Sequence, residues 1–243
     1  MYENEGTELS RLFRMAKETG VITSMDMALP DAASPAGKVD YLTILKKTLP
    51  YVDVYVPSLE ETILMLDRAE YDKLIKKADG EDLIKIVDLN ILPKLGTMLC
   101  NMGVKVLVIK CGAKGYYVKT SSREAILSIG LDADNFADRE LFEETFHVEH
   151  IKSTTGAGDV SIAAFLASLV RGYSVEDCAR LACATASLTI AESDVLSGIR
   201  PLPQTLEIVQ NWDRDRIHID GDYFEYNESE KIWYSQKDCV LGK

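Results

Sequence analysis

The chain contains an almost continuously apolar stretch, Val104-Lys105-Val106-Leu107-Val108-Ile109. A strand that is apolar on both faces is typical of a parallel sheet covered by helices, because neither face then meets water. The residues just before it, 91–102, carry apolar side chains at helical spacing and end at Gly103, a residue type that commonly closes a helix. Residues 91–109 therefore predict a unit made of a helix followed by a strand.

The same unit occurs twice upstream. Residues 9–16 have apolar side chains at helical spacing, and residues 21–25 then read as a buried strand. Residues 42–49 predict another helix, which is followed by a strand at 53–56 and by a helix that opens at Ser58. This alternation predicts an α/β fold of three layers, with a mostly parallel sheet and helices on both of its faces.

The middle of the chain is less regular. Residues 68–88 are rich in Lys, Asp and Glu and read as a solvated helical segment. Residues 116–148 contain strand-like pieces at 116–118 and 146–148 around an acidic stretch. We expect no functional site in the first of these segments.

The C-terminal part combines long helices with an aromatic tail. Two apolar helices are expected, at about 157–169 and 174–190. The aromatic segments 222–228 and 231–234 predict a small hairpin. We therefore divide the chain into a main domain and a C-terminal appendage made of a helix and this hairpin, at 1–205 and 206–243.

Composition excludes several classes of partner. The chain has 243 residues, with 27 Lys and Arg against 39 Asp and Glu, which gives a formal net charge of −12. A chain of this charge that lacks a local basic patch has no general attraction to phosphate backbones or to anionic lipid. We therefore expect no nucleic-acid partner and no membrane partner.

The cysteines and the N-terminus indicate a cytoplasmic protein. The five cysteines form no Cys-x-x-Cys pair and lie mostly in apolar segments, which is typical of reduced, buried thiols: Cys100, Cys111, Cys178, Cys183 and Cys239. Residues 1–5 are polar and acidic, and no apolar signal segment follows them. No run of residues is long enough to span a bilayer.

The motif with the most chemical content is Thr154-Thr155-Gly156-Ala157-Gly158-Asp159, which lies before a long apolar helix. Glycines let a ligand approach the backbone, and the unbonded N–H groups of a first helical turn attract an anion such as phosphate. Asp159 is placed to accept a proton from an attacking hydroxyl, as phosphoryl transfer to an alcohol requires. On composition alone, a glycine-rich turn with a helix-stabilising Asp is an equally good interpretation.

In this context the sequence resembles the ribokinase-like family of carbohydrate kinases, also called the PfkB family. The C-terminal signature of that family, Asp/Thr-Thr-x-Gly-Ala-Gly-Asp before an apolar helix, matches residues 154–159 with residues 160–169. Residues 108–115 resemble the family's strand and glycine loop beside the nucleotide, and residues 49–61 resemble the segment that normally contains Pro-Asn-x-x-Glu. The likeness covers most of residues 6–205.

The resemblance implies ATP-dependent phosphoryl transfer to a hydroxyl of a sugar, sugar-like or nucleoside substrate. It makes Asp159 the catalytic base and Gly156, Ala157 and Gly158 the anion hole. It also implies the cofactors ATP and Mg²⁺, with Glu61 acting on the metal through bound water. The residues that the resemblance places at the nucleotide are Lys110, Gly112, Gly115, Thr155, Cys183, Ser197 and Gly198.

Departures from the family pattern leave some roles open. Ser58 stands where the family usually has Asn, and Ser58 with Glu61 is also a helix-capping pattern, so Glu61 has a structural interpretation beside its metal role. Asp26 resembles the first residue of a family Asp-x-Asn element, but Ala28 replaces the second polar residue, and the role of Asp26 stays undecided. Residues 182–186 and the loop 194–198 lie where the family forms its adenine pocket, although small helical residues more often serve close packing.

Other site motifs are absent from the sequence. It contains no Gly-x-x-x-x-Gly-Lys-Ser/Thr, which excludes a P-loop, and no Gly-x-Gly-x-x-Gly after an early strand. The spacing of His147 and His150 puts them on opposite faces of a strand, which argues against a metal site. No histidine accompanies a Ser or Cys nucleophile motif, so hydrolase chemistry has little support.

The likeness begins partway through the family pattern. The family's sugar loop, substrate-binding acid and lid have no counterpart before Gly6. We therefore expect a ribokinase-like domain truncated at its N-terminus, inactive alone as a sugar kinase, and paired as a homodimer through an uncovered sheet edge. Two hypotheses follow: the parent protein is a sugar or nucleoside kinase, or the chain is a non-catalytic nucleotide-binding or regulatory module with decayed sugar and magnesium elements.

Overall fold

The computed structural model describes residues 2–31 and 34–238, and Cys239, expected to be a buried thiol, lies outside the described residues. The chain forms two compact units. Unit 1 contains residues 1–111 and 119–130, and unit 2 contains residues 112–118 and 131–243. Strand β4 (Gly115–Thr120) runs from unit 2 into unit 1.

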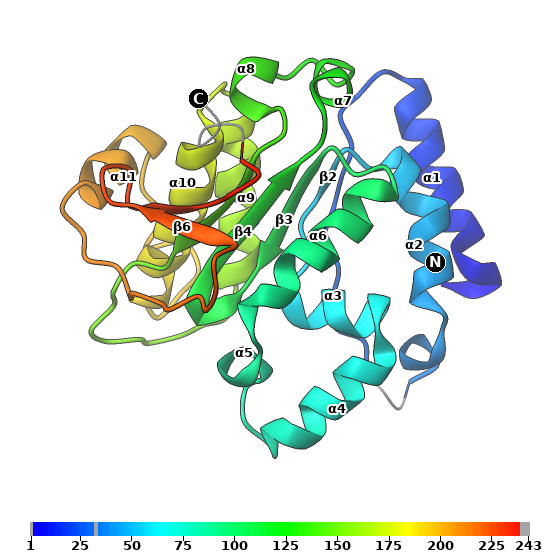
Figure 1. Ribbon diagram of the computed structural model, residues 1–243, viewed down its shortest axis with the longest axis horizontal. Helices are drawn as coiled ribbons and strands as arrows, with labels where there is room; N and C mark the ends of the chain where they lie inside the picture. The colour runs from blue at the N-terminus through cyan, green and yellow to red at the C-terminus, as the bar shows by residue number, and fades with distance from the viewer. Residues whose placement is uncertain (1, 32–33, 239–243) are drawn as a thin grey trace. The chain divides into compact units, whose positions relative to one another are not determined.

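Unit 1 is built on parallel strands in the order β1 (Ser24–Met25), β2 (Val54–Tyr55) and β3 (Val106–Lys110). Val54 of the central strand pairs with Ser24 on one side and with Val106 on the other. The helices of unit 1 are α1 (Thr7–Glu18), α2 (Tyr41–Thr48), α3 (Leu59–Leu66), α4 (Arg68–Ala78), α5 (Leu83–Ile86), α6 (Leu92–Asn101) and α7 (Arg123–Leu127), with 3-10 turns η1 (Glu3–Gly6), η2 (Ala36–Lys38), η3 (Leu49–Tyr51) and η4 (Leu89–Ile91) (Figure 1).

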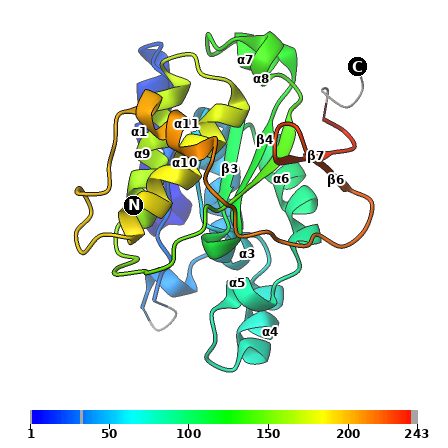
Figure 2. The ribbon, with the colours of Figure 1, turned by 90° about the vertical axis from the view of Figure 1, so that its left-hand side faces the viewer.

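Helices cover both faces of this parallel sheet, as the alternation predicts. Figure 2 shows α1 and α6 on opposite sides of the strands of unit 1. Side-chain caps fix where helices begin: the Asp40 carboxylate accepts a hydrogen bond from the Thr43 N–H at the start of α2. Because the strands are parallel, their C-terminal ends lie at one edge of the sheet, where open α/β sheets commonly bind ligands.

The strand predicted at 21–25 is shorter than expected. Only Ser24 and Met25 pair with β2, and the apolar side chains of Val21 and Ile22 are 50% and 42% exposed, so the prediction that they are buried was wrong. β1 is the outermost strand of this sheet among the described residues. The sequence shows that a segment is apolar, but it does not show that the segment lies at an edge.

Unit 2 contains a mixed set of strands in the order β4, β5 (Glu140–Glu144), β7 (Ile232–Ser235) and β6 (Phe224–Asn227). β7 is antiparallel to both β5 and β6, so the parallel arrangement predicted for the sheet does not extend through unit 2. The predicted aromatic hairpin is confirmed as β6–β7, and β7 pairs with β5 within the unit. The helices of unit 2 are α8 (Ala133–Phe136), α9 (Ala157–Leu169), α10 (Val175–Ile190) and α11 (Leu202–Val209), with the 3-10 turn η5 (Gly112–Lys114).

The acidic stretch expected between two strand-like pieces is itself a strand. All five residues of β5 are buried, three of them glutamates. Glu140 accepts hydrogen bonds from tyrosine hydroxyls, and Glu143 and Glu144 accept from arginine and tryptophan side chains, which makes burial of the carboxylates tolerable. The piece expected at 146–148 contributes an isolated bridge between Phe146 and Arg214.

The structure confirms the α/β class, with helices and parallel strands in unit 1. Cys111, Cys178 and Cys183 are buried, as predicted, whereas Cys100 is only half-buried. Within residues 2–31 and 34–238, no helix combines the length and the apolar character that a membrane crossing needs.

Candidate functional site

Helix α9 starts from a glycine turn in unit 2. Gly156 precedes its first residue with a φ of +77°, a conformation that favours glycine. A side chain at this position would also collide with Val195, because its Cβ would lie 2.8 Å from side-chain carbons of Val195. The turn therefore depends on glycine twice, and it packs directly against the loop 194–198.

The predicted anion hole is only partly available to a ligand. The Ala157 N–H donates to the Thr154 carbonyl at 3.3 Å, and the Thr155 N–H donates to the Ser153 hydroxyl at 3.3 Å. The N–H groups of Gly158 and Asp159 have no acceptor in the described part of the chain, because the first N–H groups of a helix have no partner within it. These two groups carry the partial positive charge of the helix start.

Gly158 is a glycine that the protein itself does not require. It lies inside α9, its φ is not in the left-handed region, and nothing lies within 4 Å of the position that its Cβ would take. Glycine inside a helix costs roughly 0.5–1 kcal/mol relative to alanine. A ligand that approaches the helix start closely would explain a glycine at this position.

Asp159 follows Gly158 and is exposed at the start of α9. The structure gives its carboxylate no hydrogen bond and no ion pair with any described residue. Asp177 occupies the same position in the first turn of α10, but its carboxylate is engaged by Arg180 at 2.8 Å. The carboxylate of Asp159 is therefore available to accept a proton from a ligand.

The second glycine turn, at 112–115, has a packing requirement of its own. Gly115 has a φ of +129°, and its Cβ would lie 2.0 Å from the carbonyl oxygen of Glu143 in β5. The Thr145 hydroxyl donates to the Ala113 carbonyl at 2.9 Å and holds the turn at the end of β5. Gly112 has a φ of +53°. The conformation of this turn therefore accounts for its glycines without a ligand.

The third predicted segment, the loop 194–198, is held together by Asp194. Its carboxylate accepts the N–H groups of Leu196 and Ser197 at 2.8 Å and the Ser197 hydroxyl at 2.6 Å, and these hydrogen bonds lower the pKa of Asp194. A Cβ on Gly198 would lie 2.4 Å from the Leu188 carbonyl oxygen. Ser197 therefore shapes the loop through its hydroxyl, and Gly198 allows the loop to pass α10.

Cys183 is buried beside the same Glu143 carbonyl against which Gly115 packs. It is 1% exposed, and its thiol faces the Glu143 carbonyl at 3.9 Å. Two residues later, the Thr185 hydroxyl donates to the Leu181 carbonyl at 2.7 Å. The segment 182–186 thus makes the packing contacts that small helical residues commonly make.

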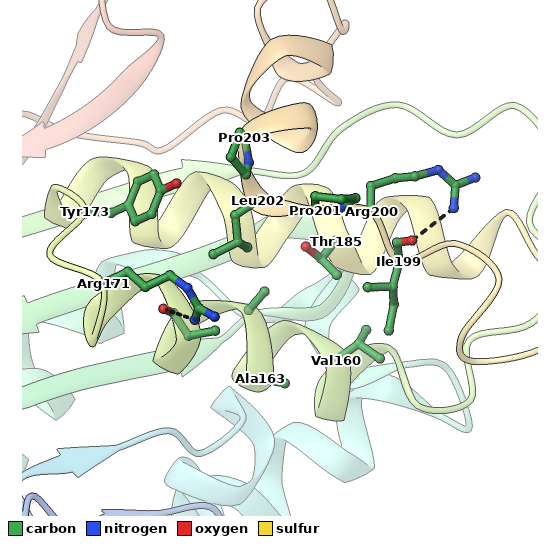
Figure 3. Close-up of a pocket in the computed structure, with 12 residues that line it drawn as sticks. Val160, Ala163, Arg171, Tyr173, Thr185, Ile199, Arg200, Pro201, Leu202 and Pro203 are labelled. Atoms are coloured by element: carbon green, nitrogen blue, oxygen red, sulfur yellow. Dashed lines mark hydrogen bonds between the residues drawn. The ribbon is translucent and has the colours of Figure 1, made fainter.

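Unit 2 also contains a cavity of about 660 Å³ that the sequence did not reveal. It begins beside the predicted site, at Val160 and Ile199, which directly follow Asp159 and Gly198. Figure 3 shows helix α9 along one side of it and residues 199–203 along the other. Its lining is mostly small or apolar side chains: Val160, Ala163, Ala164, Ala167, Arg171, Tyr173, Thr185, Ile199, Arg200, Pro201, Leu202 and Pro203.

A separate cluster of charges lies in unit 1, at the C-terminal ends of its parallel strands. The Lys110 ammonium donates to Asp26 Oδ1 at 2.6 Å. The Lys110 N–H donates to the Pro57 carbonyl at 2.9 Å, and Lys110 forms an isolated parallel bridge with Ser58. The predicted nucleotide residue Lys110 is thus brought beside Asp26 and beside the start of α3.

Glu61 has the capping role that the sequence left open. The Ser58 N–H donates to Glu61 Oε2 at 2.6 Å, and the Glu61 N–H donates to the Ser58 hydroxyl at 3.2 Å. Glu61 is 8% exposed, and this burial raises the pKa of its carboxyl, although the hydrogen bonds from Ser58 and the charge of Lys110 offset part of the rise. The cap leaves Glu61 Oε1 without a donor in the described part of the chain.

These carboxylates fit a hydrated Mg²⁺ better than a bare one. Three or more His, Cys, Asp or Glu side chains that could hold a metal ion do not gather anywhere in the described residues. Asp26 and Glu61 each use one oxygen within the protein and leave one without a described donor. Mg²⁺ keeps several waters and needs few protein ligands, so two such oxygens fit an ion that arrives with a phosphate group.

Residues 6–201 match a family described as pfkB family carbohydrate kinase. A ribokinase of Arabidopsis thaliana is 28% identical over 109 residues, which are 45% of this chain and 25% of that protein. The chain therefore spans about a quarter of that curated relative in the matched region.

Several solved structures have a similar fold. A protein described as a ribokinase II of E. coli gives a TM-score of 0.59 at 17% identity, over 86% of this chain and 55% of that one. The ribokinase of Arabidopsis thaliana with ribose and ATP gives 0.55 at 20% identity, over 84% and 52%. Phosphofructokinase-2 of E. coli gives 0.56 at 16% identity, over 84% and 51%. At these identities the similarity shows the fold alone, and this chain spans about half the length of each structure.

Proposed function

Because this chain belongs to the pfkB family of carbohydrate kinases, we propose that the protein transfers the γ-phosphoryl group of ATP to a hydroxyl group of a sugar or nucleoside. The chain spans about half the length of the solved relatives, so the activity is assigned to the protein as a whole. The names of similar structures, a ribokinase with ribose and ATP and an aminoimidazole riboside kinase, support this substrate class.

The observation that carries the proposal is the pairing of Gly158 with Asp159. Gly158 leaves open space at the start of α9, although the helix backbone does not require a glycine there. Beside that space, Asp159 presents a carboxylate that has no described partner. A helix start that offers two N–H groups and a carboxylate suits a phosphoryl group with an attacking hydroxyl. The helix dipole alone would account for an acid at Asp159. It would not account for a glycine at 158, where the backbone does not require one.

Asp159 acts in this proposal as the general base. Its carboxylate accepts the proton of the acceptor hydroxyl as the oxygen attacks phosphorus. The N–H groups of Gly158 and Asp159 hold the negative charge of the transferring group, and they need no reorganisation because the helix already aims them. The chain then supplies proton acceptance and charge stabilisation from one helical turn.

The nucleotide-side residues fall into two groups in this proposal. Thr155 and the turn that begins at Gly112 offer backbone and hydroxyl groups to the nucleotide, and Lys110 offers a cation to its phosphates. Residues with strong packing contacts act by shaping the site instead: Gly115, Cys183, Ser197 and Gly198. Mg²⁺, when bound, supplies further neutralisation of phosphate charge, and Glu61 with Asp26 would hold its waters.

The decisive experiment compares two aspartates at the same helical position. Asp159→Asn in the protein should reduce ATP-dependent phosphorylation of an accepted sugar or nucleoside by roughly two to four orders of magnitude while ADP affinity is unchanged. Asp177→Asn, the equivalent change in α10, should leave the rate near normal. Near-normal turnover of Asp159→Asn would reduce Asp159 to a helix-start residue.

The same assays examine the remaining expectations. If the protein binds ADP but phosphorylates no member of a sugar and nucleoside panel, the non-catalytic module becomes the better hypothesis. Residues 1–243 alone are expected to bind ADP without phosphorylating a sugar. Light scattering at several concentrations tests whether they form a homodimer.

A further inference from the structure

Lys110 interacts with two carboxylates at the end of the parallel strands of unit 1. Its Nζ lies 2.6 Å from Asp26 Oδ1, and its side chain is only 13% exposed. The charge of Lys110 lowers the pKa of Glu61, and the charge of Asp26 raises the pKa of Glu61. The three groups are therefore close enough to interact electrostatically. The cluster therefore has one cation for two acids, one of them almost completely buried.

The carboxylates of Asp26 and Glu61 have few other hydrogen-bond donors among the described residues. Glu61 is 8% exposed, and its Oε1 has no donor among the described residues. Tyr55 is fully buried nearby, and the negative charges of Glu61 and Asp26 add to the effect of burial in raising the pKa of its phenol. The described hydrogen bond of that phenol goes to the Met65 sulfur at 3.9 Å, a weak acceptor, and not to either carboxylate.

We infer that Lys110 is a built-in counter-ion of Asp26, which keeps a free divalent cation off Asp26 and Glu61 until a phosphate group draws its ammonium away. The inference rests on the proposed function and adds an order of events to it. The phosphate group binds first, and the divalent cation that accompanies it meets the two carboxylates second.

Competition for one carboxylate is the physical reason. An ammonium at hydrogen-bond distance neutralises the charge of the Asp26 carboxylate and takes up space beside it, and two neighbouring cations repel each other. A phosphate oxygen is an equally good acceptor for the ammonium, and its arrival releases Asp26. The divalent metal should therefore bind weakly to the protein without phosphate, and it should bind more tightly once a phosphate group is present.

The first arm of the test uses metal alone. Mn²⁺ is titrated into the protein without nucleotide, and unbound Mn²⁺ is read by electron paramagnetic resonance. Lys110→Met should tighten Mn²⁺ binding by about tenfold or more, since it removes the competing charge. Lys110→Gln should do the same, and the double variant Lys110→Met/Asp26→Asn should return to weak binding.

Controls separate this effect from a structural role of the ion pair. Lys73→Met removes a lysine from an exposed ion pair with Glu70 and should leave Mn²⁺ affinity unchanged. Circular dichroism checks that each variant is folded. If both folded Lys110 variants bind Mn²⁺ no more tightly than the wild type, the ion pair is only structural and the inference is wrong.

The second arm uses ADP in the absence of metal. Asp26→Asn frees Lys110 and should tighten metal-free ADP binding severalfold in calorimetry, whereas Lys110→Met should weaken it. Unchanged ADP affinity in both variants would overturn the inference. If no variant and no wild-type protein binds ADP at all, the proposed function fails, and the Mn²⁺ result still decides whether Lys110 blocks the metal.

Discussion

Arg214 donates from its Nε to a carboxylate oxygen of Glu143 at 2.9 Å, and neither side chain is more than 4% exposed. Glu143 belongs to β5, and Arg214 lies in the segment after α11. Arg180 of α10 approaches the other oxygen of Glu143 at 3.9 Å. A buried acid therefore ties a strand, a helix and the C-terminal segment of unit 2 together.

This acid predicts a specific pH dependence of stability. Burial raises the pKa of Glu143 from 4.5 to about 7, although Arg214 and Arg180 lower it in part. Since the folded pKa lies above the unfolded one, the contribution of Glu143 is fully present below about pH 4.5 and is lost as the pH rises through about 7. The free energy of unfolding should fall by about 3 kcal/mol at most across this interval.

Urea unfolding of the wild type and of Glu143→Gln, at pH values from about 5 to about 8, measures this contribution. The variant should lack the fall that the wild type shows, whatever its absolute stability. Parallel pH profiles for the two proteins would contradict the prediction.

Gly115→Ala should be severely destabilising. Its Cβ would lie 2.0 Å from the Glu143 carbonyl oxygen at a φ of +129°, so the β4 turn or β5 must move. We expect a loss of about 3 kcal/mol or more in the free energy of unfolding. Gly172→Ala is the matched control: it has a φ of +76° with nothing within 4 Å and should cost only about 1 kcal/mol. Equal losses of unfolding free energy in the two variants would contradict this prediction, because they would show that β5 moves aside at little cost.

Gly158→Ala should move stability and binding in opposite directions. The position is helical and spacious, so alanine should stabilise the protein by about 0.5–1 kcal/mol in urea unfolding. The added methyl group should obstruct a phosphate at the start of α9 and weaken ADP binding by about tenfold in calorimetry. A stabilised variant with unchanged ADP affinity would remove Gly158 from the anion hole.

Asp53→Asn should destabilise unit 1. The Asp53 carboxylate is completely buried and accepts hydrogen bonds from the Lys17 ammonium at 2.7 Å and from the Thr23 N–H at 3.0 Å. Loss of its charge leaves Lys17 unpaired and should cost about 2–4 kcal/mol in chemical denaturation. Asp72→Asn, which breaks the exposed pair with Arg68, should cost under about 0.5 kcal/mol. A small effect at Asp53 would mean that water replaces its partners.

The sequence predicted the parallel core and the long helices because their signals are local. The apolar stretch at β3 and the helical spacing of α9 and α10 are visible within a few residues. The limits of the edge strand β1 were not visible, because exposure of Val21 and Ile22 depends on what lies beside them.

β5 was missed for a different physical reason. Its glutamates read only as an acidic stretch, and their donors come from distant parts of the chain, such as Arg214, Tyr223 and Trp233. A buried acid and an exposed acid look the same in a sequence until the partner is known.

The candidate site shows the same division. The motif at 154–159 and its place at a helix start could be predicted, because both are local. The reasons for Gly115 and Gly198 could not, because the atoms that exclude a side chain there are the carbonyl oxygens of Glu143 and Leu188. The ion pair between Lys110 and Asp26 joins the last residue of β3 to the residue that follows β1, and it has no sequence signal.

The contact of Gly156 with Val195 couples the start of α9 to the loop 194–198. A ligand that immobilises the helix start also restricts the loop, and the conformational entropy lost there lowers the ligand's affinity. Because of this coupling, the dynamics of the loop should report ligand binding at the start of α9 even if the ligand does not contact the loop. Amide hydrogen exchange at Leu196 and Ser197, which Asp194 already holds, would slow further when an anion settles at the first turn of α9.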